Sequence, residues 1–84
     1  MYYTYILYSE AFNKYYIGFT HDLEKRVFSH NHPKNKGYTR KFQPWILVYY
    51  KIFNSKTIAI QFERYLKSLK NAQYILDKIQ KKEF

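Results

Sequence analysis

No cysteine occurs in these 84 residues, so neither a disulfide nor a thiolate zinc site can stabilise the fold. The stability must come from side-chain packing. A chain of this length has room for one modest core, and we expect a single domain over residues 1–84. Hydrophobic residues make up 46% of the chain and aromatic residues 23%, which is enough to build that core.

The first part of the chain is typical of a β-hairpin. Residues 2–8 and 15–19 are rich in β-branched and aromatic side chains, which predicts two strands. The segment between them is turn-like, with Asn13 as the bend residue. Thr20 or Asp22 would then cap a first helix.

That first helix is predicted over residues 23–30, and residues 31–44 are expected to form a polar loop. Residues 45–53 are almost continuously apolar, which predicts a third strand that is well buried. The loop contains three residues that break regular structure: Pro33, Gly37 and Pro44.

Two helices complete the prediction. Asn54 or Ser55 would cap a long helix that ends near Leu69, and a short helix follows over residues 74–79. The order is β-β-α-β-α-α, an α+β fold in which helices flank a small three-stranded antiparallel sheet. The predicted core stripe of the long helix is Ile58, Phe62, Leu66 and Leu69.

The charge favours a polyanionic partner. Fifteen Lys and Arg against six acids give a net charge of +9. Residues 25–70 carry eleven cationic side chains and one acid, Glu63. A merely solvated surface is one alternative. An anionic membrane is less favoured, because no basic amphipathic helix with a broad apolar face stands out. We therefore expect nucleic acid as the partner.

No feature of the sequence predicts insertion into a membrane or export. The longest apolar run, residues 45–50, is too short to span a bilayer. The start of the sequence has no basic segment and no small-residue cleavage site of a signal peptide. We therefore expect a cytoplasmic protein.

The hairpin brings two tyrosines together if its register is set by the turn. Pairing of Tyr8 with Tyr15 places Tyr5 opposite Gly18, with Tyr16 as a diagonal neighbour on the same face. Gly18 would then leave open space over the sheet, where a ligand backbone could approach. On composition alone, these are two of eleven tyrosines that pack with their hydroxyl groups in water.

Residues 3–5 (Tyr-Thr-Tyr) and 16–18 (Tyr-Ile-Gly), followed by Arg26 and Glu63, resemble the GIY-YIG nuclease superfamily. The resemblance covers essentially the whole chain, and it is closest to short stand-alone bacterial proteins of this type. The second motif with the following Asp-Leu-Glu-Lys-Arg is specific, whereas the first keeps only its final tyrosine. The resemblance implies a small three-stranded sheet with flanking helices.

The resemblance also implies an activity, namely metal-dependent hydrolysis of phosphodiester bonds in DNA by an activated water. Tyr5 and Tyr16 would position or deprotonate that water, and Arg26 would face the scissile phosphate. His30 stands where relatives carry a Tyr or His. Glu63 would bind one divalent ion, Mg²⁺ or Mn²⁺.

The chemistry of these residues is consistent with the implied roles. Arg26 and His30 are four residues apart, so they share one helix face and can address one phosphate. A guanidinium can hold two phosphate oxygens at once. The alternatives are that Arg26 pairs with Asp22 on a solvated face, and that His30 is a surface histidine near a loop.

Glu63 is the single carboxylate in the cationic region. One carboxylate cannot enclose Mg²⁺, but this ion commonly keeps waters and takes ligands from substrate phosphates. The alternative is a surface ion pair with Lys67. Asn71 is a candidate for a second polar ligand.

The remaining predicted contacts follow the nucleic-acid backbone without reading bases. Specificity could then come from a partner protein. The predicted nucleic-acid contacts are Gly18, Lys34, Lys36, Arg40, Lys41 and Lys67.

Two other functions stay open. Several relatives carry Lys after the glycine of the second motif, where Phe19 stands here. A catalytically weak or inactive nucleic-acid-binding module of the same fold is therefore an alternative to the endonuclease. A basic protein-interaction or structural domain is the third hypothesis.

Overall fold

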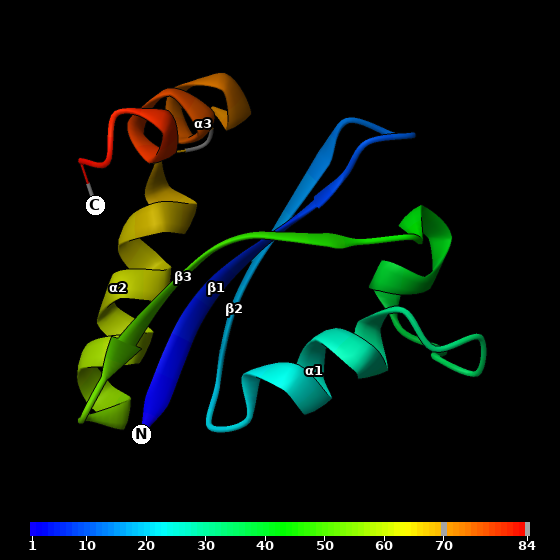
Figure 1. Cartoon of the computed structure of the whole chain (residues 1–84), viewed down its shortest axis with the longest axis horizontal. Helices are drawn as coiled ribbons and strands as arrows, with labels where there is room; N and C mark the ends of the chain where they lie inside the picture. Colours follow the sequence, from blue (N-terminus) through cyan, green and yellow to red (C-terminus); the bar gives the residue numbers. More distant parts are fainter. Residues whose placement is uncertain (70, 84) are drawn as a thin grey trace.

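The computed structural model describes residues 1–69 and 71–83 (Figure 1). The strands are β1 (Tyr2–Ser9), β2 (Lys14–Thr20) and β3 (Ile46–Phe53). The helices are α1 (Leu23–His30), α2 (Lys56–Ser68) and α3 (Ala72–Gln80), with a 3₁₀ helix η1 (Tyr38–Phe42) between α1 and β3. This order confirms the predicted α+β fold. None of the described helices is both long and apolar enough to cross a bilayer.

The sheet is antiparallel, and its strand order is β2-β1-β3. Tyr8 pairs with Tyr15, and Tyr5 lies opposite Gly18, so the predicted hairpin register is confirmed. Asn13 adopts a left-handed backbone conformation with φ of 51° at the turn. The central position of β1 explains why its middle residues are buried on both faces of the sheet.

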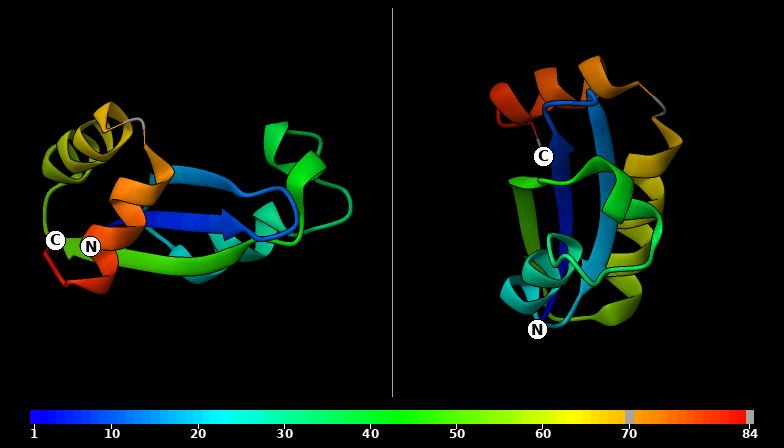
Figure 2. Two further views of the ribbon diagram at one scale, coloured as in Figure 1. Left: turned by 90° about the horizontal axis from the view of Figure 1, so that it is seen from above. Right: turned by 90° about the vertical axis from the view of Figure 1, so that its right-hand side faces the viewer.

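Helices cover both faces of the sheet. Figure 2 shows α1 and α2 on opposite sides of the three strands. Side chains alternate along a strand, so each face has its own core. One core joins the sheet to α2 and α3 through Ile6, Ile17, Leu66 and Ile75. The other lies on the α1 side and contains Tyr5, Leu7 and Trp45.

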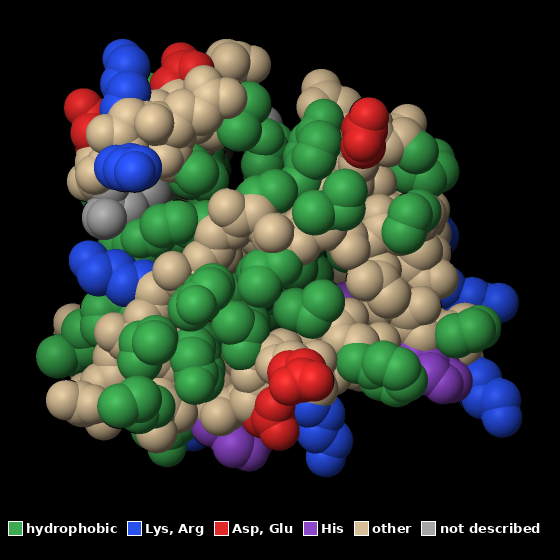
Figure 3. All heavy atoms as spheres, in the orientation of Figure 1, with side chains coloured by type: hydrophobic (Ala, Val, Ile, Leu, Met, Phe, Trp, Pro, Cys, Tyr) green, Lys and Arg blue, Asp and Glu red, His purple; other side chains and the backbone are tan. Residues whose placement is uncertain are grey.

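Strand β3 is not well buried, so that prediction is wrong. It is an edge strand, and Ile46, Tyr50 and Ile52 are 51%, 49% and 47% exposed. Helix α1 covers only part of the sheet face on which it packs. Figure 3 shows hydrophobic side chains gathered over β3. A continuous apolar run does not distinguish a central strand from an edge strand, because burial depends on the neighbours that the fold supplies.

The first position in the predicted core stripe of α2 is wrong. Ile58 is 50% exposed, whereas Ala59 is fully buried. The hydroxyl of Thr4 donates to the carbonyl of Ala59 at 2.7 Å, so α2 approaches β1 closely at this point. A small side chain fits that approach. Phe62, Leu66 and Leu69 face the core as predicted.

The helix starts carry polar caps, as expected for short helices. The carboxylate of Asp22 accepts from the backbone N–H of Lys25 at 3.1 Å at the start of α1. Ser55 caps α2, which confirms one of the two predicted choices. Asn71 caps α3 through the N–H of Tyr74 at 3.1 Å.

Residues 31–44 are more ordered than the polar loop predicted for them. They contain η1 and a cis peptide bond between Gln43 and Pro44. The side chain of Asn31 donates to the carbonyl of Trp45 at 2.9 Å and accepts from its N–H at 2.6 Å. The Trp45 indole donates to the carbonyl of Thr39 at 2.8 Å. These bonds hold the loop against the end of α1.

Candidate active site

Tyr5 lies in the middle of the sheet, with its ring across Gly18. Its side chain is fully buried at 0% exposure. A Cβ atom at Gly18 would lie 2.7 Å from Oη and 2.8 Å from Cζ of Tyr5. The expectation that Gly18 leaves open space for a ligand backbone is therefore wrong, because Tyr5 fills that space. The glycine is what allows the tyrosine to lie there.

A chain of hydrogen bonds leads from Tyr5 into the ordered loop. Oη of Tyr5 lies 2.9 Å from Nε2 of His30, the last residue of α1. Nδ1 of the same ring lies 3.0 Å from Oγ1 of Thr39. Asn35 donates to that hydroxyl at 2.8 Å. His30 and Thr39 are both buried, so His30 is not the surface histidine of the alternative.

Tyr16 packs beside this chain on the same face of the sheet. Its ring centroid lies 6.3 Å from that of Tyr5 and 4.8 Å from that of His30. Unlike Tyr5, Tyr16 is partly exposed, and it lines clefts on both of its sides. Tyr16 is therefore the more accessible of the two tyrosines.

Arg26 is exposed one helical turn before His30. It lines a cleft of about 270 Å³ together with Tyr16, His30 and residues of the loop. The alternative pairing of Arg26 with Asp22 does not occur among the described residues, because the Asp22 carboxylate caps the helix instead. The guanidinium therefore faces an open cleft.

Glu63 approaches the site from α2, which packs on the other face of the sheet. Its side chain is 14% exposed and pairs with Lys67 at 3.4 Å. The Glu63 carboxylate raises the pKa of Tyr5, so it lies within electrostatic reach of the phenol. The structure thus brings four of the five candidate residues together on the α1 side of the sheet: Tyr5, Tyr16, Arg26 and His30. Glu63 lies on α2 and is linked to them only through its electrostatic effect on Tyr5.

Burial dominates the electrostatics of this region. It raises the pKa of Tyr5 well above its ordinary value, and the nearby Tyr16 and Glu63 add to that effect while Arg26 opposes it. Burial also lowers the pKa of His30, with a further lowering from Arg26. At neutral pH both rings are therefore uncharged, and the Tyr5–His30 hydrogen bond joins a neutral phenol to a neutral imidazole.

The fold is expected to lose stability as the pH falls below about 6.5, the value at which an unfolded histidine takes up a proton. The unfolded chain then binds more protons than the folded chain, because the pKa of His30 is lowered by folding. Urea denaturation from about pH 7.5 to about pH 5.5 measures this dependence. His30→Gln should weaken it, and the difference from the wild type isolates the contribution of His30. An identical pH dependence in His30→Gln would contradict the assignment.

Comparison with known proteins identifies the family. The family described as "GIY-YIG catalytic domain" matches residues 1–76. The chain belongs to the GIY-YIG family. It is similar to the UPF0213 protein YazA of Bacillus subtilis (strain 168), with 40% identity over 74 residues that cover 84% of this chain and 75% of YazA.

Relatives also occur in Streptococcus. The UPF0213 protein SpyM50708 of Streptococcus pyogenes serotype M5 is 44% identical over 55 residues, which cover 66% of this chain and 60% of that protein. No solved structure matches this GIY-YIG chain. The family is one of nucleases, so membership implies a nucleic-acid substrate.

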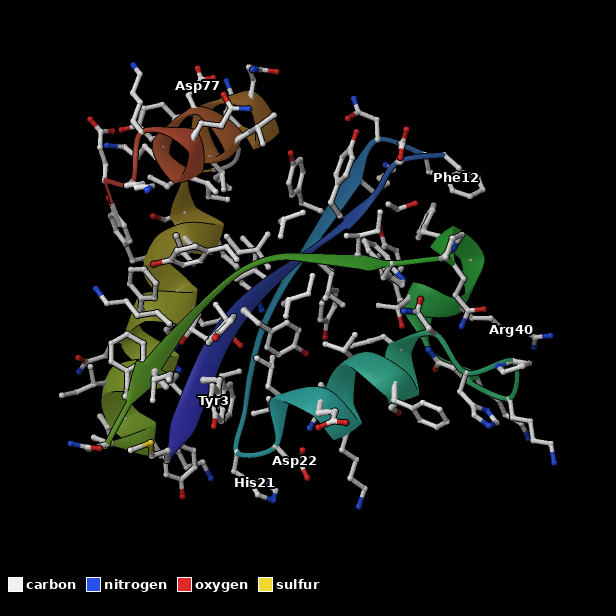
Figure 4. The ribbon with its side chains drawn as sticks, in the orientation of Figure 1. Tyr3, Phe12, His21, Asp22, Arg40 and Asp77 are labelled. Carbon is white, nitrogen blue, oxygen red and sulfur yellow. The ribbon has the colours of Figure 1, made fainter. Side chains whose placement is uncertain are left out.

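The predicted cationic contacts of this GIY-YIG domain lie mainly on the ordered loop, which forms one wall of the Arg26 cleft. Their side chains are exposed, and Figure 4 shows Arg40 extending outward from η1. Lys67 lies on α2 instead, beside Glu63. The exposed cations of the loop are Lys34, Lys36, Arg40 and Lys41.

GIY-YIG nucleases generally use a divalent metal ion. The described residues contain no cluster of three or more His, Asp or Glu side chains that would enclose such an ion. Asn71 is engaged as the cap of α3 through its side-chain oxygen. Glu63 thus offers one carboxylate, a donor set that fits Mg²⁺ when the substrate and water supply the other ligands.

Sequence reasoning missed Thr39 and Asn35. Thr39 contacts His30 across nine positions of irregular chain, so no periodic pattern links the two. The sequence feature that could have pointed to them is that the loop contains neutral hydrogen-bonding side chains as well as charged ones. Asn35 accepts from the N–H of Gly37 at 2.8 Å, an Asx-type turn that the Asn-Lys-Gly sequence permits.

Proposed function

We propose that this GIY-YIG protein is a metal-dependent endonuclease that hydrolyses phosphodiester bonds in DNA by attack of water. The observation that carries the proposal is the convergence of two tyrosines and a histidine beside an exposed arginine. Tyr16, His30 and Arg26 line one cleft, with Tyr5 directly behind them. Such a site combines a phosphate ligand with groups that can hold water and take up a proton.

Arg26 is proposed to bind the scissile phosphate. Its exposed guanidinium can donate two parallel hydrogen bonds to phosphate oxygens. Negative charge grows on those oxygens as water attacks, so a cation fixed beside them stabilises the transition state more than the ground state. Its place on α1, one turn from the buried His30, holds the guanidinium at a defined distance from the tyrosines.

The two tyrosines are proposed to act in different ways. Tyr16 is partly exposed and would hold the attacking water in place. Tyr5 is fully buried and hydrogen-bonded to His30, so it would take part in proton transfer behind Tyr16. This assignment rests on the partial exposure of Tyr16 and on the burial and hydrogen bond of Tyr5.

Glu63 is proposed to hold one divalent ion, Mg²⁺ or Mn²⁺. A bound divalent cation supplies Lewis-acid stabilisation of phosphate charge. Lys67 neutralises the Glu63 carboxylate in the structure, so the lysine must release it before the carboxylate can act as a ligand. The released lysine would then be available to a neighbouring phosphate.

The nucleic-acid strand is proposed to run along the β2 side of the molecule. Tyr16 separates the Arg26 cleft from a second one of about 400 Å³, which Lys14, Lys67 and Asn71 line. The basic loop and these lysines would contact phosphates on either side of the cut. Phosphate contacts carry no sequence information, so a partner protein could supply specificity.

The opposite side of α1 does not suit a phosphate backbone. A groove of about 610 Å³ there is lined by apolar side chains of α1, β1 and β3. Asp22 and Glu24 stand at its rim, and the labelled Asp22 lies at the start of α1 in Figure 4. Their negative charge would repel a phosphate.

The proposal is tested by incubating the purified protein with supercoiled plasmid and Mg²⁺ or Mn²⁺. Glu63→Gln should slow cleavage at least about tenfold, since a metal ligand contributes several kcal/mol of charge stabilisation. Glu83→Gln is the matched control, because Glu83 pairs with Lys78 near the end of α3. It should cleave at the wild-type rate.

Equal cleavage by wild type and Glu63→Gln would indicate a contaminating nuclease and refute the proposal. Binding to DNA that weakens steeply with salt, without cleavage, would instead support the nucleic-acid-binding module. The neutral Tyr5 and the Glu63–Lys67 ion pair are the observations that favour this second candidate.

A further inference from the structure

Four side chains form a continuous hydrogen-bonded chain behind the candidate active site, of which Tyr5, His30 and Thr39 are buried and Asn35 is partly exposed. It runs from Asn35 through Thr39 and His30 to Tyr5, with successive distances of 2.8, 3.0 and 2.9 Å. Each hydrogen bond has one donor and one acceptor. The direction of every bond can therefore be worked out from the groups at the two ends.

The direction at the loop end is set by Asn35. Its side-chain oxygen accepts from the N–H of Gly37 at 2.8 Å. Its amide nitrogen must therefore be the atom that donates to Oγ1 of Thr39. The same nitrogen lies 3.2 Å from the carbonyl oxygen of His30, an acceptor, which agrees with this orientation.

The direction at the sheet end is set by Tyr5. Its hydroxyl is fully buried and needs an acceptor for its proton. Among the described residues, Nε2 of His30 is the acceptor within hydrogen-bond distance, because the nearby Arg26 guanidinium has only donors. Nε2 must therefore carry the lone pair, and the proton of the neutral imidazole lies on Nδ1.

These directions meet at Thr39. Its oxygen accepts from the amide of Asn35 and from Nδ1–H of His30, so both of its lone pairs are used. Its own hydroxyl proton must then point elsewhere. Thr39 lines the Arg26 cleft, where such a proton can be donated to water or to a substrate oxygen.

We propose that Thr39, oriented by Asn35, is the positioning residue that fixes His30 in the Nδ1–H tautomer, so that Nε2 accepts the hydroxyl proton of Tyr5. A histidine tautomer is set by the hydrogen bond that its other nitrogen makes. The arrangement repeats the logic of a catalytic triad, in which a third group orients the base.

The consequence for cleavage rests on the proposed function. When the proton released by the water that Tyr16 holds is passed to Tyr5, the phenol can give its own proton to Nε2 of His30. His30 then becomes an imidazolium whose two N–H groups are hydrogen-bonded to Tyr5 and Thr39. One proton enters the chain at Tyr5 and one leaves Tyr5 for His30, so the phenol is neutral before and after the transfer.

The test is the ¹⁵N NMR spectrum of the His30 ring in the full chain, at a pH where the ring is neutral. The wild type is expected to show a protonated Nδ1 and an unprotonated Nε2. Thr39→Val keeps the shape of the side chain but removes the acceptor, so the Nε2–H tautomer should appear. Cleavage should fall by roughly ten- to a hundredfold, the usual effect of losing a group that orients a histidine.

Two further variants separate orientation from folding. Thr39→Ser retains the hydroxyl and should restore both the wild-type spectrum and the cleavage rate. Thr4→Val removes another buried hydroxyl, which donates to Ala59 on the other face of the sheet. It should lower the stability but leave the His30 spectrum and the cleavage rate unchanged.

An Nε2–H tautomer in the wild type would overturn the proposal, as would an unchanged Nδ1–H spectrum in Thr39→Val. If Thr39→Val does not fold, the His30 spectra of the wild type and of Thr39→Ser still test the proposal. The spectrum is read without substrate. A protein that shows the expected tautomer but does not cleave would therefore refute the proposed endonuclease and leave this inference intact.

Discussion

Arg26→Ala is expected to slow plasmid cleavage by about 10²- to 10³-fold, the usual cost of removing a donor aimed at developing charge. Arg26 is exposed in the cleft that Tyr16 and His30 also line. Its loss should leave packing intact, so urea denaturation should give nearly the wild-type free energy of unfolding. Single-turnover cleavage of plasmid with Mg²⁺ measures the effect on the chemical step.

Two substitutions distinguish a phosphate ligand from a general loss of positive charge. Arg64→Ala removes the same charge from an exposed position on α2 and should cleave at nearly the wild-type rate. Arg26→Lys keeps the charge but loses the two-pronged geometry, so it should remain strongly impaired. If Arg26→Ala were no slower than Arg64→Ala, the proposed role of Arg26 would be wrong.

Gly18→Ala is expected to destabilise the fold by about 1–3 kcal/mol, the usual cost of overpacking a core. The new Cβ would lie 2.7 Å from Oη and 2.8 Å from Cζ of Tyr5, and 3.2 Å from Cε1 of Tyr16. The Tyr5 ring cannot move aside freely, because it is fully buried and hydrogen-bonded to His30. Urea denaturation measures the loss of stability, and cleavage should also fall as Tyr5 is displaced.

A double-mutant cycle shows whether Tyr5 is the obstacle. Tyr5→Leu removes the ring that the new methyl group would meet. In that background, Gly18→Ala should destabilise the fold much less than in the wild type. Equal destabilisation in both backgrounds would mean that the cost does not arise from contact with Tyr5 but from the backbone of β2 or from Tyr16.

The features of the fold that were predicted correctly depend on residues that lie close together in the chain. The turn around Asn13 and the alternation of side chains define the pairing of Tyr8 with Tyr15, and that pairing places Tyr5 opposite Gly18. The cap at Asp22 is equally local, since it needs only a carboxylate three residues before an N–H group. Such features depend on neighbours in the chain, and so they are readable without a structure.

Features that depend on distant contacts were not predictable in the same way. Burial of β3 depends on its place at the edge of the sheet. The choice of Ala59 over Ile58 depends on how closely α2 approaches β1. In both cases the residue pattern is compatible with either outcome, and the tertiary neighbours decide between them.

The same distinction applies to the candidate site. The hairpin register was enough to suggest that Tyr5 and Tyr16 share one face, and the family resemblance added Arg26 to the site. It could not reveal that Tyr5 is sealed from solvent or that the space above Gly18 is filled. The hydrogen bond between His30 and Thr39 was also not predictable, because the folded loop brings these two residues together.

The open edge of β3 has a consequence for how copies of this protein meet. An edge strand offers unpaired backbone groups to any second strand. Burial of the half-exposed Tyr50 and Ile52 would stabilise such pairing. Two copies that each carry a net charge of +9 repel one another, and this repulsion opposes the contact. The charge that suits the protein to a polyanion therefore also disfavours edge-to-edge pairing of its molecules.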